Sequence, residues 1–551
     1  MNGDKQIIET DVLVVGAGPV GLSLALELGL QGRRCLLVEQ GDRSGLAPRA
    51  KTTNVRSREL MRRWGIADRL AAASPFGVDY PSSVVFATRL AGRELARFEN
   101  AFYCAPRRDD RFAEHAQWIP QYKVEAVLKG RALEFDRVAL RQGLALEDFR
   151  QTASGVEASL RRGDDGTALT VHAQYLVGAD GARSTVRERL GIRMEGTSPL
   201  GHHHNVVFRM PGLADRHALG PAVMYWLVNP EVPSVVAPLD QGDLWTFGCP
   251  LLGGPDVDPV PLIRTALGLG ADLPVEVLSR DVWTAHQLVA TRYREGRVFL
   301  AGDACHLHPP FGGHGMNMGI GDAVDLGWKL AAVLKGWGGP RLLDSYEAER
   351  RQVHRRVVDE SVVNLSRNSG SLWRDGLEDD GPQGEAARAA ASADILAGKR
   401  QEFDSLGVVL GSRYDGSPIL PAGAAEPVPG GDSSAYLPSA RPGCRAPHRW
   451  LAEGTAPGAS LYDRFDPAGM TLLVMREGAS ADVSAGVARV VEVASALGVP
   501  LRVLDLGASD LRSLYGADHA LIRPDQYVAW RGDSADEACA ALSVAVGRDG
   551  R

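Results

Sequence analysis

The sequence has no closely spaced pair of cysteines. Its 551 residues include six cysteines, and no two of them form a CxxC pair. A disulfide framework and a structural zinc site are therefore not expected, and a reducing cytoplasm is the simplest location for such a chain. The amino terminus also has no apolar stretch behind a basic start, so a secretory signal peptide is not expected.

Long basic runs are absent as well, and the formal net charge of −7 is mild for this length, so nucleic acid is not an expected partner. An apolar stretch over residues 12–30 could be misread as a membrane span. Three early glycines, a proline and Glu27 interrupt it, so no membrane partner is expected. With 23% charged and 44% hydrophobic residues, the chain has the composition of a globular protein of two to four domains.

A glycine-rich turn follows the first apolar run. Residues 11–15 have the continuous, β-branched pattern of a buried parallel strand, and Gly16, Gly18 and Gly21 then form GxGxxG at the start of an amphipathic helix. The three glycines permit a tight turn, close approach of a pyrophosphate and close packing of helix on strand. Glu39 ends the next strand, where it can accept both hydroxyls of an adenosine ribose. The pattern predicts a dinucleotide site but does not separate FAD from NAD.

Two later segments repeat the pattern of a short strand that ends at an acidic residue. Residues 175–192 contain a strand, Asp180 and a helix, and residues 297–334 contain a strand, Asp303 and a long helix from Gly315. Open α/β sheets bind their ligands beyond the carboxyl ends of the strands. Both acids are therefore expected at a ligand-binding edge of such a sheet.

GAGPVG, GADGARS and GDACHLHPPFGGHGMN, in this order and at these separations, resemble the motifs of the class A flavoprotein monooxygenases, which are FAD-dependent aromatic hydroxylases of the phenol hydroxylase and polyketide hydroxylase branches. The resemblance is strong over about the first 370 residues and looser beyond them. It implies an α/β protein with a Rossmann-like FAD-binding domain, an inserted antiparallel β-sheet substrate domain and a C-terminal thioredoxin-like domain. The implied divisions are an FAD-binding domain at 1–80, 100–200 and 287–370, a substrate domain at 81–99 and 201–286, a linker at 371–444 and a C-terminal domain at 445–551.

The resemblance also assigns roles to individual residues. Arg49 and Pro310 are expected beside the isoalloxazine ring, with Arg49 giving electrostatic assistance. The start of the helix at Gly315 would direct N–H groups at the flavin pyrimidine edge, which is negatively charged in reduced flavin. The implied FAD-binding residues are Gly16, Gly18, Pro19, Val20, Gly21, Glu39, Gln121, Asp180, Gly302, Asp303, Gly313, Gly315, Met316 and Asn317.

The resemblance implies a monooxygenase that uses FAD, NADPH or NADH as a transient co-substrate, and O2. It would hydroxylate a phenolic or polycyclic aromatic substrate, with polyketides among the candidates, through a flavin 4a-hydroperoxide. The same motifs serve epoxidation, Baeyer–Villiger insertion and oxidative rearrangement. A non-catalytic flavoprotein that senses an aromatic ligand and a simple FAD reductase are further alternatives. Only one GxGxxG is present, so no separate pyridine-nucleotide domain is expected, and monomer and homodimer both remain open.

Residues 201–286 have the pattern of strands separated by turns, and aromatic residues concentrate there. The resemblance implies a sheet that covers the flavin, and Tyr225, Trp226, Phe247 and His314 are expected to bind substrate. For any one aromatic, packing in the sheet core is the commoner use.

Histidines cluster at 202–204 and at 306–314. Neighbouring residues of a strand point to opposite faces, and no coherent ligand set with a carboxylate or cysteine emerges, so no metal is expected.

Beyond residue 370 the composition changes. Residues 370–443 are rich in Gly, Pro, Ala and Ser, which is typical of a partly ordered linker. From Arg445 onward, strand and helix patterns alternate, and this alternation resembles the thioredoxin-like domain of the phenol hydroxylase branch. The absence of CxxC makes redox work there unexpected and favours a structural or dimer-supporting role.

Overall fold

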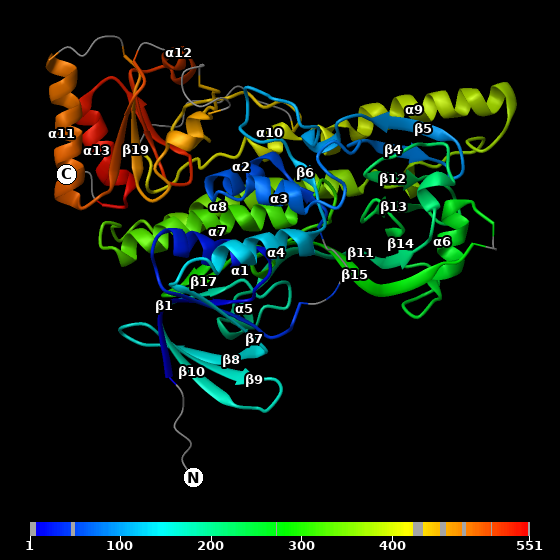
Figure 1. The fold of residues 1–551 in the computed structure, drawn as a ribbon, viewed down its shortest axis with the longest axis horizontal. Helices are drawn as coiled ribbons and strands as arrows, with labels where there is room; N and C mark the ends of the chain where they lie inside the picture. Colours follow the sequence, from blue (N-terminus) through cyan, green and yellow to red (C-terminus); the bar gives the residue numbers. More distant parts are fainter. Residues whose placement is uncertain are drawn as a thin grey trace.

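The computed structural model describes residues 7–43, 45, 50–270, 273–421, 433–451, 459–476, 481–507 and 510–548, without the side chains of 481–484. Within these ranges the chain forms two eight-stranded sheets, one four-stranded sheet and one two-stranded sheet. Figure 1 shows the four-stranded sheet at one end of the molecule and one large sheet at the other, with the long helices α7 (Gly315–Leu334) and α8 (Ser345–Leu365) between them.

The first large sheet has the strand order β16-β17-β10-β1-β2-β7, with β9 and β8 attached beyond β10. Strands β17, β10, β1, β2 and β7 run parallel. Its strands are β1 (Ile7–Val15), β2 (Cys35–Glu39), β7 (Val138–Gln142), β8 (Leu144–Gln151), β9 (Val156–Arg162), β10 (Ala168–Gly178), β16 (Arg294–Glu295) and β17 (Val298–Leu300). The parallel strands place their carboxyl ends at one edge, as the repeated strand–acid pattern predicts.

Helix α1 (Pro19–Leu30) is buried on nearly all sides, so the expected amphipathic character is wrong. It lies between the first sheet, α7 and α4 (Gln121–Ala132). Its one acid, Glu27, is fully buried and accepts hydrogen bonds from Arg63 and from the Trp64 indole. A paired carboxylate is tolerated in this interior because its oxygens are satisfied by charged and polar donors.

The second large sheet has the order β18-β15-β11-β14-β13-β12-β4-β5. Neighbours run antiparallel, except β12 and β4, which are parallel. Its strands are β4 (Val84–Ala87), β5 (Glu94–Phe98), β11 (Met194–Arg209), β12 (Met224–Leu227), β13 (Ser234–Pro238), β14 (Leu244–Pro250), β15 (Glu276–Ala290) and β18 (His306–Leu307). Because β17 belongs to the first sheet and β18 to the second, the segment between them joins the two sheets.

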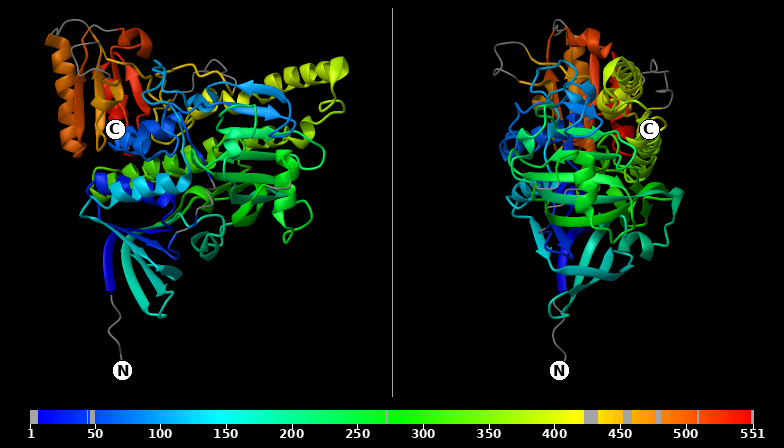
Figure 2. Two further views of the ribbon diagram at one scale, coloured as in Figure 1. Left: turned by 45° about the vertical axis from the view of Figure 1, so that its right-hand side comes forward. Right: turned by 90° about the vertical axis from the view of Figure 1, so that its right-hand side faces the viewer.

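The linker predicted over residues 371–444 is wrong for residues 381–403, which form the long helix α9 (Gly381–Phe403). This helix packs on β5, as Figure 2 shows from two sides, and α10 (Leu406–Val409) follows it. Phe403 contacts Phe98 and Phe102, with ring centroids 5.0 and 5.4 Å apart. The Gly- and Ala-rich composition suggested a linker, but alanine is the strongest helix former and tertiary packing stabilises the helix.

The C-terminal unit has the sheet order β20-β19-β21-β22, with β19 and β20 parallel and the others antiparallel. Its elements are β19 (Met470–Val474), α11 (Ala481–Leu497), β20 (Leu501–Asp505), α12 (Leu511–Tyr515), β21 (His519–Ile522), β22 (Val528–Gly532) and α13 (Ala535–Ala545). Buried Arg523 pairs with Glu349 of α8 and Asp325 of α7, which ties this unit to the central helices. Among the helices described, none is long and apolar enough to cross a bilayer.

The remaining elements are short connectors. They are β3 (Thr52–Thr53), α2 (Val55–Arg63), α3 (Ala67–Ala73), β6 (Gln117–Trp118), α5 (Thr185–Arg189) and α6 (Pro259–Leu267).

Candidate active site

The three predicted ligand-binding segments meet at one edge of the first sheet. Val15 is paired with Gly178 and Gly178 with Leu300, so β1, β10 and β17 end side by side. Backbone hydrogen bonds continue past the strand ends, from Ala179 N to Val15 O at 2.8 Å and from Ala301 N to Gly178 O at 2.9 Å. The turns that carry Gly16, Asp180 and Asp303 therefore lie next to one another.

The first turn has no space for side chains. Gly16 adopts a φ of +103°, and a Cβ on it would lie 2.4 Å from Ala179 O. A Cβ on Gly21 would lie 1.9 Å from Gly16 O, so the start of α1 packs directly on the turn. Gly18 caps α1, Pro19 is in its first turn, and Val20 contacts Gly302. This turn leaves the first N–H groups of a helix at a strand edge, which fits a pyrophosphate.

A charged corner lies beside this turn. The Glu39 carboxylate accepts hydrogen bonds from Ala17 N at 2.9 Å and from Gly41 N at 3.0 Å. Gln121 donates to Glu125 at 2.8 Å, and Arg43 lies between the acids, 3.6 Å from Glu39 and 3.0 Å from Glu125. The Arg43 guanidinium is also 3.6 Å from the position of a Cβ on Gly18. The sequence reasoning missed Arg43, although a cation four residues after the acid of the fingerprint was a usable signal.

The second and third turns are held together by Arg187. Its guanidinium donates to Ala304 O at 3.1 Å and to Ala182 O at 2.9 Å. Asp180 accepts a hydrogen bond from Val186 N at 3.1 Å, and burial raises the pKa of its carboxyl. Arg187 was also missed, because nothing in the sequence shows that its side chain spans two segments more than a hundred residues apart.

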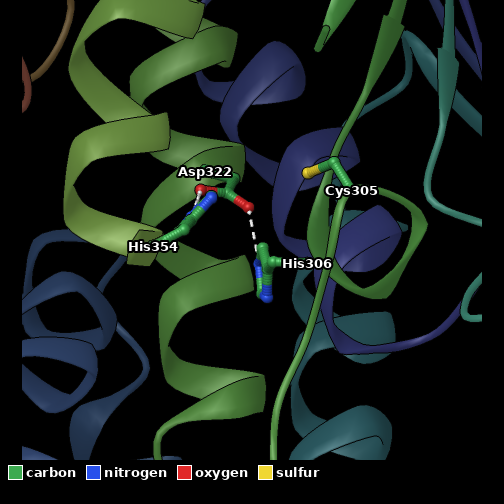
Figure 3. A group of neighbouring side chains, drawn as sticks. All are labelled: Cys305, His306, Asp322 and His354. Carbon is green, nitrogen blue, oxygen red and sulfur yellow. Dashed lines mark hydrogen bonds and ion pairs between the residues drawn. The ribbon is translucent and has the colours of Figure 1, made fainter. Parts of the chain in front are cut away.

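A buried cluster of side chains around Asp322 supports the turn that carries Asp303 (Figure 3). Asp322 accepts hydrogen bonds from Gly302 N at 3.0 Å, His306 at 3.2 Å, His354 at 2.8 Å and Arg350 at 2.7 Å. Burial alone would raise the pKa of Asp322, but His354 and Arg350 hold it well below its usual range. This carboxylate therefore fixes the backbone from which Asp303 projects.

The same cluster is the candidate metal site, because ligand atoms of Cys305, His306, Asp322 and His354 lie within 4.8 Å of one another. Each carboxylate oxygen of Asp322 already accepts two hydrogen bonds, and the Arg350 guanidinium donates one of these four bonds. Burial also raises the pKa of the Cys305 thiol well above its usual range, so it stays protonated. A cation so close to a guanidinium would be repelled, and the cluster is best described as a hydrogen-bonded support.

Residues 309–317 lead from β18 of the second sheet into the first turn of α7 and are called the 309–317 loop. Gly312 and Gly313 adopt φ values of +88° and +67°, and Pro310 is exposed. Asn317 fixes the end of the loop: its Nδ2 donates to Thr52 O at 2.9 Å, and its Oδ1 accepts from Asn54 N at 2.9 Å. Gly315 and Met316 then open α7, which presents a helix N-terminus on this loop.

Two histidines of this region have lowered pKa values. Burial lowers the pKa of His308 to about 3 and that of His314 to about 4. His314 lines a cavity of about 60 Å³ together with Asn317 and Arg350, so it lies on the α8 side of the 309–317 loop. The expectation that His314 binds substrate is not supported by this position.

The two faces of the second sheet differ. Trp226 lies on the face toward the 309–317 loop, with its ring 5.7 Å from that of Phe311. Tyr225 and Phe247 belong to the core on the opposite face, and both are at most 1% exposed. Because successive residues of a strand alternate between faces, these two side chains pack in that core and do not lie on the loop-facing side.

More residues join Trp226 on this loop-facing side. Thr246 is paired with Ala237 and with Val207, and both neighbours share its face. His203 and Trp283 are paired on the same side, and their rings stack with centroids 4.4 Å apart. His203 is thus the member of the 202–204 run that faces the loop. Arg49, expected beside the isoalloxazine ring, lies outside the described residues.

Family models match most of the chain. A model described as an FAD binding domain matches residues 9–361, and one described as the C-terminal domain of aromatic-ring hydroxylases matches residues 439–548. The chain belongs to the class A FAD-dependent aromatic hydroxylases. FAD is therefore the cofactor of this hydroxylase, and the α/β fold with a Rossmann-like domain, a substrate sheet and a C-terminal domain is confirmed.

Relatives cover the hydroxylase over its full length. Tetracenomycin B2 monooxygenase-dioxygenase of Streptomyces olivaceus is 34% identical, over 98% of each chain. The rebeccamycin biosynthetic enzyme RebC with reduced flavin is 37% identical with a TM-score of 0.88, over 98% of this chain and 99% of that one. Aklavinone-11 hydroxylase, solved with FAD and aklavinone, is 33% identical with a TM-score of 0.83 over the whole of both chains.

Proposed function

We propose that this hydroxylase inserts oxygen from O2 into a phenolic or polycyclic aromatic substrate of the polyketide type, with NADPH or NADH as reductant. The observation that carries the proposal is the position of the 309–317 loop. It lies between the edge where the three FAD-binding segments meet and the aromatic, partly polar face of the second sheet. A ring bound on that face would be next to the flavin.

The residues at the sheet edge fit FAD. We propose that the α1 N-terminus at Gly16, Gly18 and Gly21 holds the pyrophosphate and that Glu39 binds the ribose, with Gln121 and Arg43 at the same corner. We assign the ribityl chain to Asp303, supported by Asp322, and the pyrimidine edge to the α7 N-terminus at Gly315, Met316 and Asn317. We also keep the sequence-based proposal that Asp180, Pro310 and Arg49 act near the flavin. When bound, FAD supplies the redox chemistry, which is hydride acceptance and oxygen activation.

The protein's own part is positioning and exclusion of water. The loop-facing side of the second sheet offers Trp226, Val207 and Ala237 as apolar surface, and α9 closes its outer end through Phe403. A dry, aromatic wall orients a planar ring and protects reactive oxygen species from water.

The experiment is a screen of phenols and hydroxylated polyketides for faster NADPH and NADH oxidation by the FAD-loaded protein. A positive hit is repeated under ¹⁸O2, and the product is identified by mass and NMR. One labelled oxygen on a ring carbon supports the proposal. NADPH oxidation that yields only hydrogen peroxide indicates a reductase, and no oxidation with any ligand indicates a binding protein.

A deeper oxidation is the second candidate, because one full-length relative is named a monooxygenase-dioxygenase. Incorporation of more than one labelled oxygen would favour it. An epoxide or lactone has the mass of a simple hydroxylation product, so NMR decides between these.

A further inference from the structure

Lys51 spans the space between the 309–317 loop and the second sheet. Its Nζ donates to Thr246 Oγ1 at 2.9 Å, and Thr246 is on the loop-facing side of the sheet. The next residue, Thr52, lies against Gly313: a Cβ on that glycine would be 3.2 Å from Thr52 Cβ. The backbone of Lys51 is therefore fixed beside the loop. Its amine reaches the loop-facing side of the second sheet, on which a substrate ring would bind.

Among the described residues, this amine has no anionic partner. Within the part of the chain that the structure describes, no carboxylate lies within 4.0 Å of Lys51, and Thr246 Oγ1 is the only acceptor of its N–H groups. The Thr246 hydroxyl can also donate, to Ala237 O at 3.3 Å, which leaves a lone pair for the amine. Two N–H groups of an ammonium thus remain available to a ligand.

Lys51 is half-buried, and two fully buried lysines show the contrast. Lys329 pairs with Asp325 at 2.8 Å and with Glu349 at 2.6 Å. Lys399, on α9, pairs with Glu402 and lies 4.1 Å from the centre of the Trp226 ring. A buried ammonium normally requires such a counter-ion, because its desolvation is costly. Burial lowers the pKa of Lys51 to about 8, which shows the same cost without a carboxylate to offset it.

We propose that Lys51 binds the anionic oxygen of the aromatic substrate, a phenolate, against Thr246 on the loop-facing side of the second sheet. The inference rests on the proposed function and narrows it to substrates with an ionisable ring hydroxyl. A neutral Lys51 amine takes the proton as the phenol O–H bond breaks, or an ammonium meets a phenolate already formed. Both routes end in the same ammonium–phenolate pair. A phenolate is the more electron-rich ring, so this pairing favours attack on an electrophilic oxygen.

The test uses alizarin, a hydroxyanthraquinone whose visible colour changes from yellow to red-violet when its phenol ionises. Alizarin is titrated with FAD-loaded protein at neutral pH, and the phenolate fraction of the bound dye is read from its spectrum. Lys51→Met should lower the ratio of phenolate to phenol in the bound dye at least ~10-fold, which corresponds to one pKa unit. Alizarin dimethyl ether cannot ionise and should bind both proteins alike.

Three controls separate ligand binding from structural support. Thr246→Val removes the hydroxyl that holds the amine but keeps the cation, and should keep the phenolate spectrum. Lys51→Gln keeps a donor for Thr246 without a charge, and should lose that spectrum even if Lys51→Met fails to fold. Lys123→Met changes an exposed lysine of α4 and should change nothing. Flavin content and Tm are measured for each protein.

An unchanged phenolate fraction in both Lys51 variants overturns the inference, and so does failure of the wild type to bind alizarin. Equal loss in Thr246→Val and Lys51→Gln also overturns it, because the pair would then be a structural link. The two proposals fail differently. If the Lys51 variants form product like wild type and keep the phenolate spectrum, this inference fails and the hydroxylase function stands. If no phenol stimulates NADPH oxidation but Lys51 still sets the dye spectrum, the proposed function fails and the anion site stands.

Discussion

The edge of the first sheet and the loop-facing side of the second sheet serve the same proposed reaction by different means. At the edge, the site is formed mainly by backbone. Glycines, strand ends and two helix N-termini meet there, and a Cβ on Gly16 would lie 2.4 Å from Ala179 O. On the sheet face, the site is formed by side chains, and Trp226, Thr246 and His203 come from three different strands. A backbone site tolerates almost no change of residue, whereas a side-chain site can be altered by single substitutions.

The two sites also rest on different supports. Behind the edge lies a fully buried ionic network around Asp322. Behind the sheet face lies an apolar core that includes Tyr225, Phe247 and Trp245. The edge should therefore respond strongly to a loss of charge, and the face mainly to a loss of volume.

The largest effect is expected at the first glycine turn. Gly16→Ala meets a φ of +103° and a backbone oxygen of the neighbouring strand, so we expect loss of FAD and a destabilisation of about 3 kcal/mol or more. Flavin absorbance after purification and urea unfolding measure both. Gly130→Ala is the matched control: it lies in α4 with no atom within 4 Å of the added Cβ, and it should stabilise by up to ~1 kcal/mol. Retention of flavin by Gly16→Ala would show that the turn is less rigid than its geometry indicates.

The second test removes the charge behind the edge. Asp322→Asn leaves Arg350 buried without its carboxylate, and breaking such a pair costs about 3–5 kcal/mol. The FAD affinity should fall too, because Gly302 N loses its anionic acceptor. Asp344→Asn breaks the exposed pair with Arg294 and should cost less than ~1 kcal/mol. Equal losses in the two variants, measured by chemical unfolding, would contradict a supporting role for the buried network.

The third test uses pH. The pKa of His314 is lowered from 6.5 to about 4 by burial, so the folded protein keeps this side chain neutral. The stability that this neutral side chain contributes to the folded protein is fully present above pH 6.5. It is lost as the pH falls toward 4, because the unfolded chain then binds more protons than the folded chain. The expected slope is about 1.4 kcal/mol per pH unit for this one group.

His314→Asn should lower that slope in urea unfolding, and the remaining slope should include His308, whose pKa is about 3. Gly130→Ala, which changes no titratable group, should leave the slope unchanged. If both variants give the wild-type slope, His314 does not stay neutral in the folded protein.

The smallest effect is expected from the comparison of the two faces of the second sheet. Trp226→Leu should raise the KM of an accepted aromatic about 10-fold, or ~1.4 kcal/mol, because it removes a ring from the loop-facing wall. Phe247→Leu, on the opposite face, should cost ~1 kcal/mol of stability and leave KM within about twofold. A larger KM change for Phe247→Leu than for Trp226→Leu would reverse the assignment of the faces.

The glycine turn, the strand–acid segments and the start of α7 were all predictable, because each is a contiguous stretch whose residues perform a backbone function. Their meeting at one edge follows from parallel strands alone. Arg187, Asp322 and Lys51 were not predictable, since each acts through a contact with a segment distant in the sequence. Tyr225 and Trp226 show the same limit. They are adjacent aromatic residues, either of which could bind a substrate ring, and only the orientation of the strand decides which one packs in the opposite core and which one faces the loop.

The sequence by itself determined where the strand–turn–helix backbone of the proposed FAD site forms, because glycine spacing, β-branched runs and helix starts are local properties. It also determined the family. The tertiary structure alone decided which face of the second sheet turns toward the 309–317 loop and that α9 covers β5 instead of forming a linker. It also decided that Lys51 pairs with Thr246 and with no carboxylate of the described residues. Burial and charge pairing depend on neighbours that the chain supplies only when it folds, so no local pattern encodes them.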